Sequence, residues 1–288
     1  MGSWRMIETG DGDSVRNMAI DWALLELRGE GSIPDIIRFY SWRDMAVSLG
    51  YSQDIDQELD LELCRQFRVE TVFRPTGGAL VLHGGDLTYS VVSGMKGTNP
   101  AEWAAFGWRI GCVICKGLSR IGFQPTCVTD GYGGRMMNRG ACFSTLSRHE
   151  IVVKGRKITG NARRWRSGAL LQHGSIPLRR ISLSVVDLMK GLSPRERLAR
   201  RAELDGHSTS VGEEAGRAVT YEELWPILLG AFRDEFGEVG DGDSLREVIC
   251  ARAEACVERV LKGPAYRKGI RDARVGRVKS AAGVEGGR

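Results

Sequence analysis

The stretch that decides the fold runs from residue 149 to residue 162 and reads HEIVVKGRKITGNA. Two segments of alternating apolar residues flank the pair Lys154-Gly155, a pattern typical of a β-hairpin. Lys157 follows on the second strand, shortly before Gly160. A lysine held on a strand beside a glycine can present its ammonium group to a carbonyl oxygen, a carboxylate or a phosphate. An ordinary hairpin with a solvated lysine fits the same residues.

A cysteine precedes this hairpin by seven residues: Cys142, in the sequence Gly140-Ala141-Cys142-Phe143. The thiolate form of cysteine is a strong nucleophile, and a nearby cation favours that form. A thiol close to a fixed lysine is therefore a candidate pair for acyl transfer. An inert cysteine remains the alternative from this local pattern.

Four blocks of sequence, one of them within the stretch quoted above, occur in the order found in one known family. They read NMAID at residues 17–21, RPTGGALVLHGGDLTYSVV at 74–92, GRKITGNA at 155–162 and LQHGSI at 171–176. Together they extend over most of residues 14–190 and resemble the lipoate-protein ligase A and octanoyltransferase superfamily, which shares its catalytic fold with biotin protein ligases. Cys142 matches the cysteine position of the single-domain, cysteine-dependent octanoyltransferases, so the chain most resembles that branch.

The order of strand and helix patterns predicts an α+β domain. The resemblance implies a mixed, mostly antiparallel sheet with flanking helices, as in a biotin/lipoate protein ligase-like catalytic domain. We expect one domain over residues 1–262, with a helical C-terminal part from about 217 to 262, and a disordered basic tail over 263–288. The polar segment 193–216 is expected to be a connector. The expected strands are 36–40, 46–49, 70–73, 80–83, 87–92, 150–159 and 169–178, and the expected helices are 13–28, 59–67, 101–121, 221–236 and 244–261.

Composition is typical of a globular protein, with 42% hydrophobic and 27% charged residues. No apolar run approaches the ~18 residues of a membrane span, and the first residues lack the apolar stretch of a signal peptide. Seven cysteines, an odd number without a disulfide-like framework, suit a reducing compartment. We therefore expect a cytoplasmic enzyme without a membrane partner.

Positive charge is concentrated around the candidate site. Residues 139–201 hold 15 lysines and arginines against 3 acidic residues, whereas the whole chain carries a net charge of only +5. Such a field can steer an acidic partner. Nucleic acid is not expected, because no helix-turn-helix, aromatic RNA-binding or zinc-finger pattern accompanies the arginines. An acidic carrier protein fits, with Arg163, Arg164, Arg166, Arg179 and Arg180 as its candidate contacts, and so does a merely solvated basic face.

The resemblance assigns roles to individual residues. Cys142 and Lys157 are implied to be catalytic, and the loop after Phe73 is implied to line the acyl pocket. The implied substrate-binding residues are Arg74, Thr76, Gly77, Gly78, His83, Gly160, Asn161, Ala162, His173 and Gly174. The same residues also fit a β-turn and structurally bound histidines. No metal site is expected, because the histidine and cysteine spacings match no zinc pattern.

Two chemistries occur in the family that the chain resembles. Ligases activate free lipoate with ATP and Mg, whereas transferases take octanoate from a thioester on acyl carrier protein and need no cofactor. The presence of Cys142 favours the transferase, with a lysine of a lipoyl domain as the acceptor, such as that of glycine cleavage H protein or 2-oxoacid dehydrogenase E2. An amidotransferase that moves octanoyl between lipoyl domains would also use a cysteine thioester and fits the same residues. A noncatalytic module that binds an acylated carrier is a further alternative.

Four positions depart from the family pattern. Phe73 replaces an arginine, Ala79 follows the glycine pair, and Asn161 and Arg163 stand in a segment that usually reads Gly-Ser-Ala-Gln. Loss of polar groups near the pocket mouth would alter the acyl acceptor or the chain length. Because Cys142 and Lys157 are kept, an acyltransferase remains the expectation.

Overall fold

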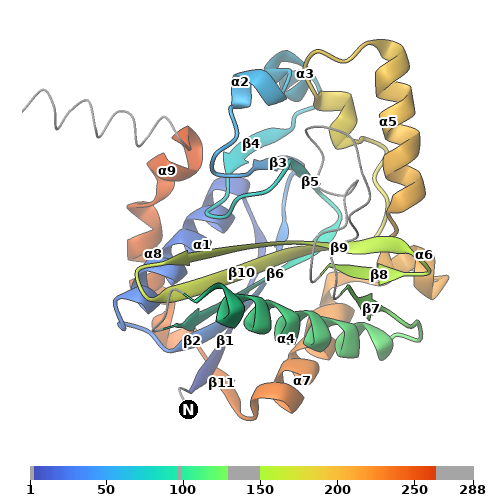
Figure 1. Ribbon diagram of the computed structural model, residues 1–288. Coiled ribbons are helices and arrows are strands. Elements are labelled where there is room, and N and C mark those ends of the chain that lie inside the picture. The colour runs from blue at the N-terminus through green and yellow to red at the C-terminus, as the bar shows by residue number, and fades with distance from the viewer. Residues whose placement is uncertain (1–2, 96–98, 129–149, 264–288) are drawn as a thin grey trace, which may run out of the picture.

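A large twisted sheet forms the centre of the computed structural model, which describes residues 3–95, 99–128 and 150–263 (Figure 1). Strands β1 and β2 pair in parallel, as do β1 and β11, and the other neighbours are antiparallel. The expected mixed, mostly antiparallel sheet is therefore confirmed. Its order is β11 (Val239–Asp241), β1 (Trp4–Gly12), β2 (Asp35–Trp42), β6 (Asp86–Gly94), β10 (Ala169–Pro177), β9 (Arg156–Arg166), β8 (Ile151–Val153) and β7 (Thr126–Cys127).

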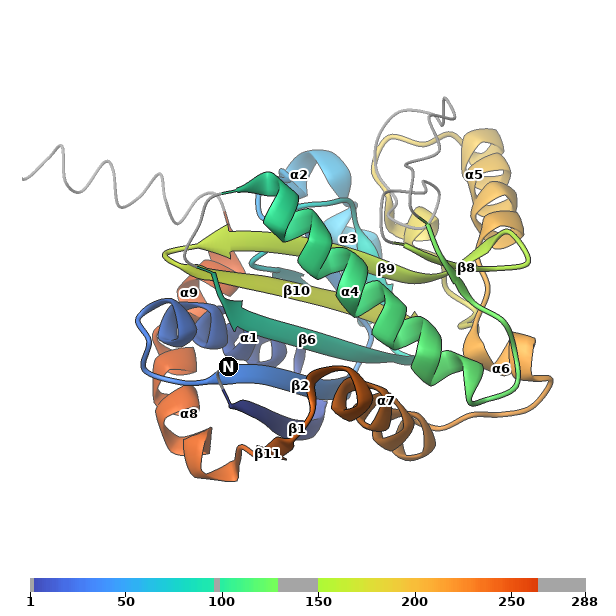
Figure 2. The same ribbon diagram turned by 60° about the horizontal axis from the view of Figure 1, so that its bottom comes forward.

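Helices cover both faces of this sheet (Figure 2). On one face, α4 (Pro100–Ser119) and α7 (Tyr221–Phe236) bury an apolar layer that includes Ile110, Ile114 and Phe232. On the other face, α1 (Ser14–Gly29) packs with α8 (Arg246–Glu254) and α9 (Val257–Lys262). The N-cap of α1 is Asp13, whose side chain accepts a hydrogen bond from the Arg16 backbone N–H. The helix was expected to begin at this residue.

A smaller sheet stands at one edge of the large one and builds a third apolar core. Its strands are β4 (Glu70–Phe73), β3 (Ala46–Leu49) and β5 (Val81–His83). Around it lie α2 (Ile55–Glu58), α3 (Leu61–Gln66), the 3-10 helix η2 (Val185–Leu188) and α5 (Pro194–His207). The loop between β4 and β5 carries the sequence RPTGG, so this sheet holds that loop against the large sheet.

Three expectations about local structure are wrong. The segment 193–216 is not an irregular connector, because it forms α5 and α6 (Val211–Ala215). Each helix begins with a capping box, from Ser193 to Glu196 and from Ser210 to Glu213, and α5 buries no residue completely, so it lacks the apolar periodicity of a core helix.

The other two errors concern the ends of the fold. The strand β1 was not expected, since its polar residues hide the alternation of a half-buried strand. The helix expected over 244–261 is divided into η3 (Asp243–Leu245), α8 and α9. No helix within the described ranges is long and apolar enough to cross a membrane. The expected tail from residue 264 onward lies outside those ranges.

Candidate active site

A cavity at the junction of the two sheets brings together most of the site residues expected from the sequence. Its empty volume, which includes solvent at the open mouth, is about 360 Å³, and it lies between α1, the small sheet and strands β2, β6, β9 and β10. Its apolar wall includes Met18, Trp42 and Val81. Seven of the expected residues line it: Arg74, His83, Gly160, Asn161, Ala162, His173 and Gly174. We call this space the acyl cavity, after the ligand that the family resemblance implies for it.

His173 is held by a buried network centred on Asp21. Its Nδ1 lies 2.8 Å from Asp21 Oδ2, and its Nε2 lies 2.7 Å from the Thr76 hydroxyl. A carboxylate can only accept, so Nδ1 carries the proton and the hydroxyl donates to Nε2. Asp21 also accepts a hydrogen bond from Arg38, at 2.8 Å. Burial raises the pKa of a carboxyl group, but the hydrogen bond from His173 and the charge of Arg38 together hold the pKa of Asp21 below its ordinary value.

His83 is fixed in the same way by a second buried aspartate. Its Nδ1 lies 2.8 Å from Asp86 Oδ2, and its Nε2 lies 2.9 Å from the Ser48 hydroxyl. Its ring stacks on Trp42 with 3.8 Å between the ring centroids. Because the polar atoms of both histidines are used by the protein, a ligand in the acyl cavity meets mainly their carbon surfaces.

The His173 pair predicts how stability depends on pH. Burial lowers the pKa of His173, despite its bond with Asp21, so the folded protein holds a neutral imidazole. The unfolded chain binds a proton at about pH 6.5, so stability falls as the pH drops below that value, by up to about 1.4 kcal/mol per pH unit. Thermal unfolding between pH 7.5 and pH 5.5 should show this loss, and His173→Gln should flatten it. An equal slope in the variant would mean that other groups cause the loss.

The Arg74 side chain forms hydrogen bonds within its own loop, between β4 and β5. It is almost completely buried and donates to the carbonyl groups of Ser48, Gly77 and Ala79. Gly78, with φ at +100°, lets the backbone fold around the guanidinium, which lies 2.8 Å from where a Cβ would stand. The loop is therefore rigid, and the hydroxyl of Thr76 reaches His173 from it.

Lys157 is buried, which excludes the solvated lysine that fitted its sequence pattern. Its side chain is 1% exposed and its Nζ lies 2.5 Å from Oε1 of Glu150, which is 3% exposed. Both residues belong to the hairpin of β8 and β9, and Glu150 directly precedes β8. Glu150 was not assigned a role from the sequence, although it stands in the deciding stretch. Removal of either partner would leave the other charge buried without this compensation.

The four departures from the family pattern have distinct surroundings. The Phe73 ring is buried and would touch a Cβ at Gly263, so it packs against the end of α9, and the Ala79 carbonyl binds Arg74. Asn161 accepts a hydrogen bond from the Tyr89 hydroxyl at 2.6 Å. Gly174 was expected to leave room for a ligand. A Cβ at Gly174 would clash with the side chains of Asn161 and Tyr89, so this glycine leaves room for them, and it also borders the acyl cavity.

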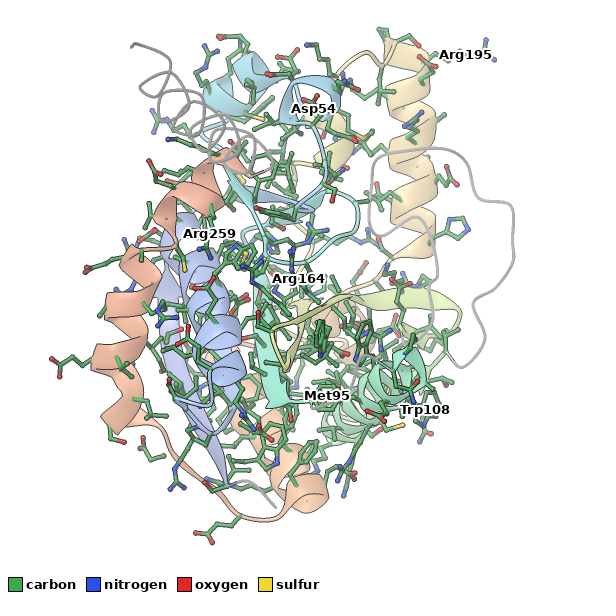
Figure 3. The ribbon with its side chains drawn as sticks, turned by 60° about the vertical axis from the view of Figure 1, so that its left-hand side comes forward. Asp54, Met95, Trp108, Arg164, Arg195 and Arg259 are labelled. Atoms are coloured by element: carbon green, nitrogen blue, oxygen red, sulfur yellow. The ribbon has the colours of Figure 1, made fainter. Side chains whose placement is uncertain are left out.

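The basic residues expected to face a partner do not share one surface. Arg163 donates to the Trp103 carbonyl and lies against Gly107 of α4, and burial lowers its pKa. Arg164 donates to the Pro75 carbonyl and lies 5.0 Å from the centre of the Trp22 ring (Figure 3). Arg179 and Arg180 are exposed. Arg163 and Arg164 are half-buried and make contacts within the fold, and Arg166, also half-buried, lies 5.6 Å from the centre of the Trp22 ring.

Cys142, the expected nucleophile, lies outside the described residues, as does His149. Within the described ranges, no group of three or more histidine, cysteine or acidic side chains has the arrangement of a metal site. Asp21 and Asp86 stood in the quoted sequence blocks without an assigned role, because nothing in a sequence distinguishes an aspartate that anchors a histidine from one on the surface.

Several known proteins are similar to this chain over most of its length. The model of the lipoyl protein ligase A/B catalytic domain family matches residues 13–233. A curated octanoyltransferase LipM of Symbiobacterium thermophilum is 35% identical over 266 residues, covering 89% of this chain and 94% of its own. The LipM octanoyltransferase of Kyrpidia tusciae is 32% identical over 246 residues, covering 82% and 88%, respectively.

Solved structures with this fold include lipoate-protein ligases. A lipoate-protein ligase A bound with ATP superposes with a TM-score of 0.70 at 21% identity, covering 89% of this chain and 95% of its own. A bipartite lipoate protein ligase from Thermoplasma acidophilum gives a TM-score of 0.71 at 20% identity, with coverage of 90% and 93%. At these identities the similarity establishes the fold.

Proposed function

The chain belongs to the lipoyl protein ligase A/B catalytic domain family, and on this premise we propose that it is an octanoyltransferase of protein lipoylation. The relatives compared above are octanoyltransferases with 32–35% identity over most of the chain, which favours transfer over ATP-dependent ligation. The observation that carries the assignment to this structure is the buried Lys157, which pairs with Glu150 and lies on β9, the strand that also contributes Gly160, Asn161 and Ala162 to the acyl cavity.

The reaction proceeds in two acyl exchanges. The Cys142 sulfur attacks the carbonyl carbon of an octanoyl thioester, and the donor thiol leaves with the proton that Cys142 loses. The amine of an acceptor lysine then attacks the octanoyl-Cys142 thioester, an amide forms, and the thiol of Cys142 is restored. Both steps balance without an oxidant or ATP, because a thioester is already activated.

Lys157 supplies positive charge where negative charge develops. Each exchange passes through a tetrahedral intermediate whose oxygen is negative, and a buried cation stabilises it more strongly than a solvated one. Glu150 compensates the ammonium charge and fixes its position in the resting enzyme.

The octanoyl chain occupies the acyl cavity in this proposal. Burial of each methylene contributes about 0.8 kcal/mol, which corresponds to roughly a fourfold change in kcat/KM. A hexanoyl donor, shorter by two methylenes, should therefore react about 15-fold less efficiently than an octanoyl donor on the same carrier. Competition between the two donors, read by mass spectrometry of the acceptor, measures this ratio directly. Equal reactivity would place the acyl chain elsewhere.

The partners follow from the proposed reaction. The donor is octanoyl-acyl carrier protein, and the acceptor is a lipoyl domain such as that of glycine cleavage H protein or a 2-oxoacid dehydrogenase E2. The enzyme works in the cytoplasm without a cofactor. Of the arginines expected to contact an acidic carrier, Arg179 and Arg180 are exposed and can still do so.

One experiment tests the function itself. The protein is incubated with octanoyl-acyl carrier protein without ATP, weighed intact, and then given an apo lipoyl domain. An octanoylated enzyme followed by an octanoylated lipoyl domain is the expected result. Acceptor modification that requires ATP and free acid would instead mark a ligase, and reaction only with an octanoylated lipoyl domain as donor would mark an amidotransferase.

A further inference from the structure

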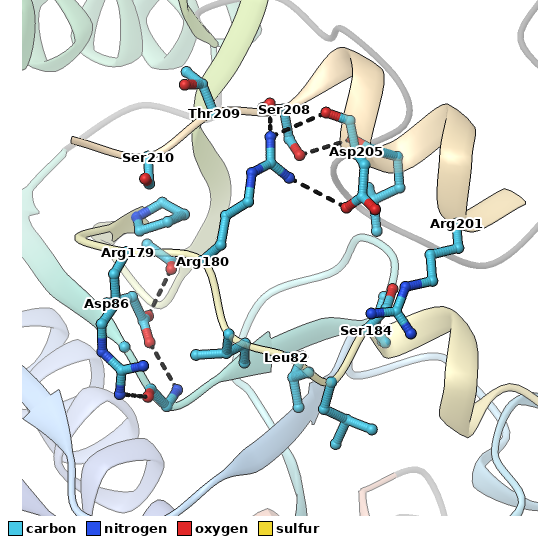
Figure 4. Close-up of a pocket in the computed structure, with 18 of the residues that line it drawn as sticks. Leu82, Asp86, Arg179, Arg180, Ser184, Arg201, Asp205, Ser208, Thr209 and Ser210 are labelled. Atoms are coloured by element: carbon cyan, nitrogen blue, oxygen red, sulfur yellow. Dashed lines mark hydrogen bonds and ion pairs between the residues drawn. The ribbon is translucent and has the colours of Figure 1, made fainter. Parts of the chain in front are cut away.

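A second and larger cavity adjoins the acyl cavity, with about 800 Å³ of empty space (Figure 4). Ser175 lines both cavities. Asp86, in the wall of the second, accepts hydrogen bonds from His83 of the acyl cavity at 2.8 Å and from the Ser175 hydroxyl at 2.6 Å. The two cavities therefore meet at the cluster formed by His83, Asp86 and Ser175.

The second cavity also borders the strand that carries Lys157. The Thr209 backbone, which lines the cavity, donates a hydrogen bond to the Lys157 carbonyl at 2.9 Å. The neighbouring Ser208 forms a β-bridge with Lys157. A molecule in this cavity would thus lie next to both the acyl cavity and the segment of β9 that holds the lysine.

The lining of the cavity combines an apolar floor with hydroxyl groups and charged residues. Figure 4 shows Arg179, Arg180 and Arg201 on different sides of it, with Leu82 between them. The apolar residues are Leu80, Leu82, Ile181, Leu183, Val185 and Leu204, and the hydroxyl residues are Ser184, Ser208, Thr209 and Ser210. Such a surface suits an extended chain that alternates methylene groups with amides.

The charges of the lining favour a single negative group. The lining holds three arginines, and two of them, Arg180 and Arg201, already pair with carboxylates. Arg180 contacts Asp205 and Arg201 contacts Asp187, whereas Arg179 contacts the Gly84 carbonyl at 3.3 Å and, within the described part of the chain, no carboxylate. Arg179 is therefore the cation best placed to bind a phosphodiester.

We propose that this second cavity binds the thiol-bearing prosthetic arm of the acyl donor, a chain of the phosphopantetheine class. The inference rests on the proposed function, since it needs a thioester donor. The sulfur end lies at the cluster of His83, Asp86 and Ser175, where the acyl cavity begins. The two amides follow the lined channel, and the phosphate reaches Arg179.

A nucleotide is the competing occupant, and the lining disfavours it. Among the described residues that line the cavity none is aromatic, so no ring offers a stacking surface to a purine base. The carboxylates of Asp86 and Asp205 in the lining would also oppose the several negative charges of a triphosphate. A single phosphodiester needs only one cation, which Arg179 can supply.

The test compares three octanoyl thioesters: those of phosphopantetheine, pantetheine and N-acetylcysteamine. The wild-type enzyme should prefer them in that order by kcat/KM. Arg179→Ala should lower kcat/KM for the phosphopantetheine donor by about tenfold and largely remove its advantage over the pantetheine donor. Arg195→Ala is the matched control, because Arg195 is exposed at the start of α5 and is not among the residues that line the cavity.

A pair of tryptophan variants on α5 tests the channel itself. Leu204→Trp fills the cavity and should impair both donors with a long arm more than the N-acetylcysteamine donor. Leu198→Trp is its control, since Leu198 is 72% exposed on the same helix. Circular dichroism and thermal unfolding check that each variant is folded.

Each outcome decides the proposal. If the wild-type enzyme uses all three donors equally, the cavity does not bind the arm, while the proposed octanoyl transfer still stands. If ATP inhibits the phosphopantetheine donor competitively and Arg179→Ala relieves the inhibition, a nucleotide is the occupant. If neither octanoyl-acyl carrier protein nor any of the three donors reacts, the proposed function itself is wrong.

Discussion

Replacing Cys142 with alanine should abolish octanoyl transfer while leaving the fold intact. Under the proposed function its sulfur is the only nucleophile that accepts the acyl group, so its loss removes both half-reactions rather than slowing one. Intact mass spectrometry after incubation with octanoyl-acyl carrier protein should show no acyl-enzyme, and an apo lipoyl domain added afterwards should stay unmodified. Thermal unfolding should be close to that of the wild-type protein.

The chain offers its own control for this prediction. Cys112 is exposed on α4, so Cys112→Ala removes a thiol without disturbing a core. That variant should form the acyl-enzyme normally. A Cys142→Ala enzyme that still octanoylates the lipoyl domain at the wild-type rate contradicts the cysteine mechanism. ATP-dependent attachment of free lipoate by the same variant would return the ligase to consideration.

Much of the fold could be predicted from residue patterns, for reasons visible in individual elements. The strands 46–49 and 70–73 and the helix 221–236 have the expected bounds, because a short apolar run bounded by polar residues and the apolar face of an amphipathic helix can both be recognised in the sequence. By contrast, α5 is stabilised by its capping box and by contacts of one side with η2, so its own sequence shows little periodicity. Strand β1 also shows little periodicity, and it is held in the sheet by its pairing with β2 and β11.

The site was harder to predict than the fold, because its organising contacts join residues far apart in the chain. His173 and Asp21 are 152 residues apart, and Ser175 and Asp86 are 89 apart. The family resemblance pointed to the cavity-lining residues, but it did not indicate that Arg74 binds its own loop or that Arg163 points at α4. The partner of Lys157 is near in sequence, yet only the hairpin places Glu150 beside it.

The Lys157–Glu150 pair makes it possible to separate the stability of the enzyme from its catalysis. Lys157→Ala leaves the carboxylate of Glu150 buried without its cation, which typically costs about 3–5 kcal/mol, or roughly 10 °C in Tm. The same variant loses an electrostatic donor to the oxyanion, worth about 10²–10³ in rate. A loss of turnover in this variant alone would not show which effect caused it.

The double variant Lys157→Met with Glu150→Gln removes both charges of this pair together. Its Tm should return close to that of the wild-type protein, since replacing a whole buried pair by neutral groups is often neutral for stability. Its turnover should stay lower by at least about 10²-fold, because no ammonium is present to stabilise the oxyanion. Lys157→Arg should not rescue, as the guanidinium is larger and its charge is spread over a plane. Wild-type turnover in the stable double variant would make the pair purely structural, whereas a stable but inactive double variant assigns the charge of Lys157 to the reaction itself.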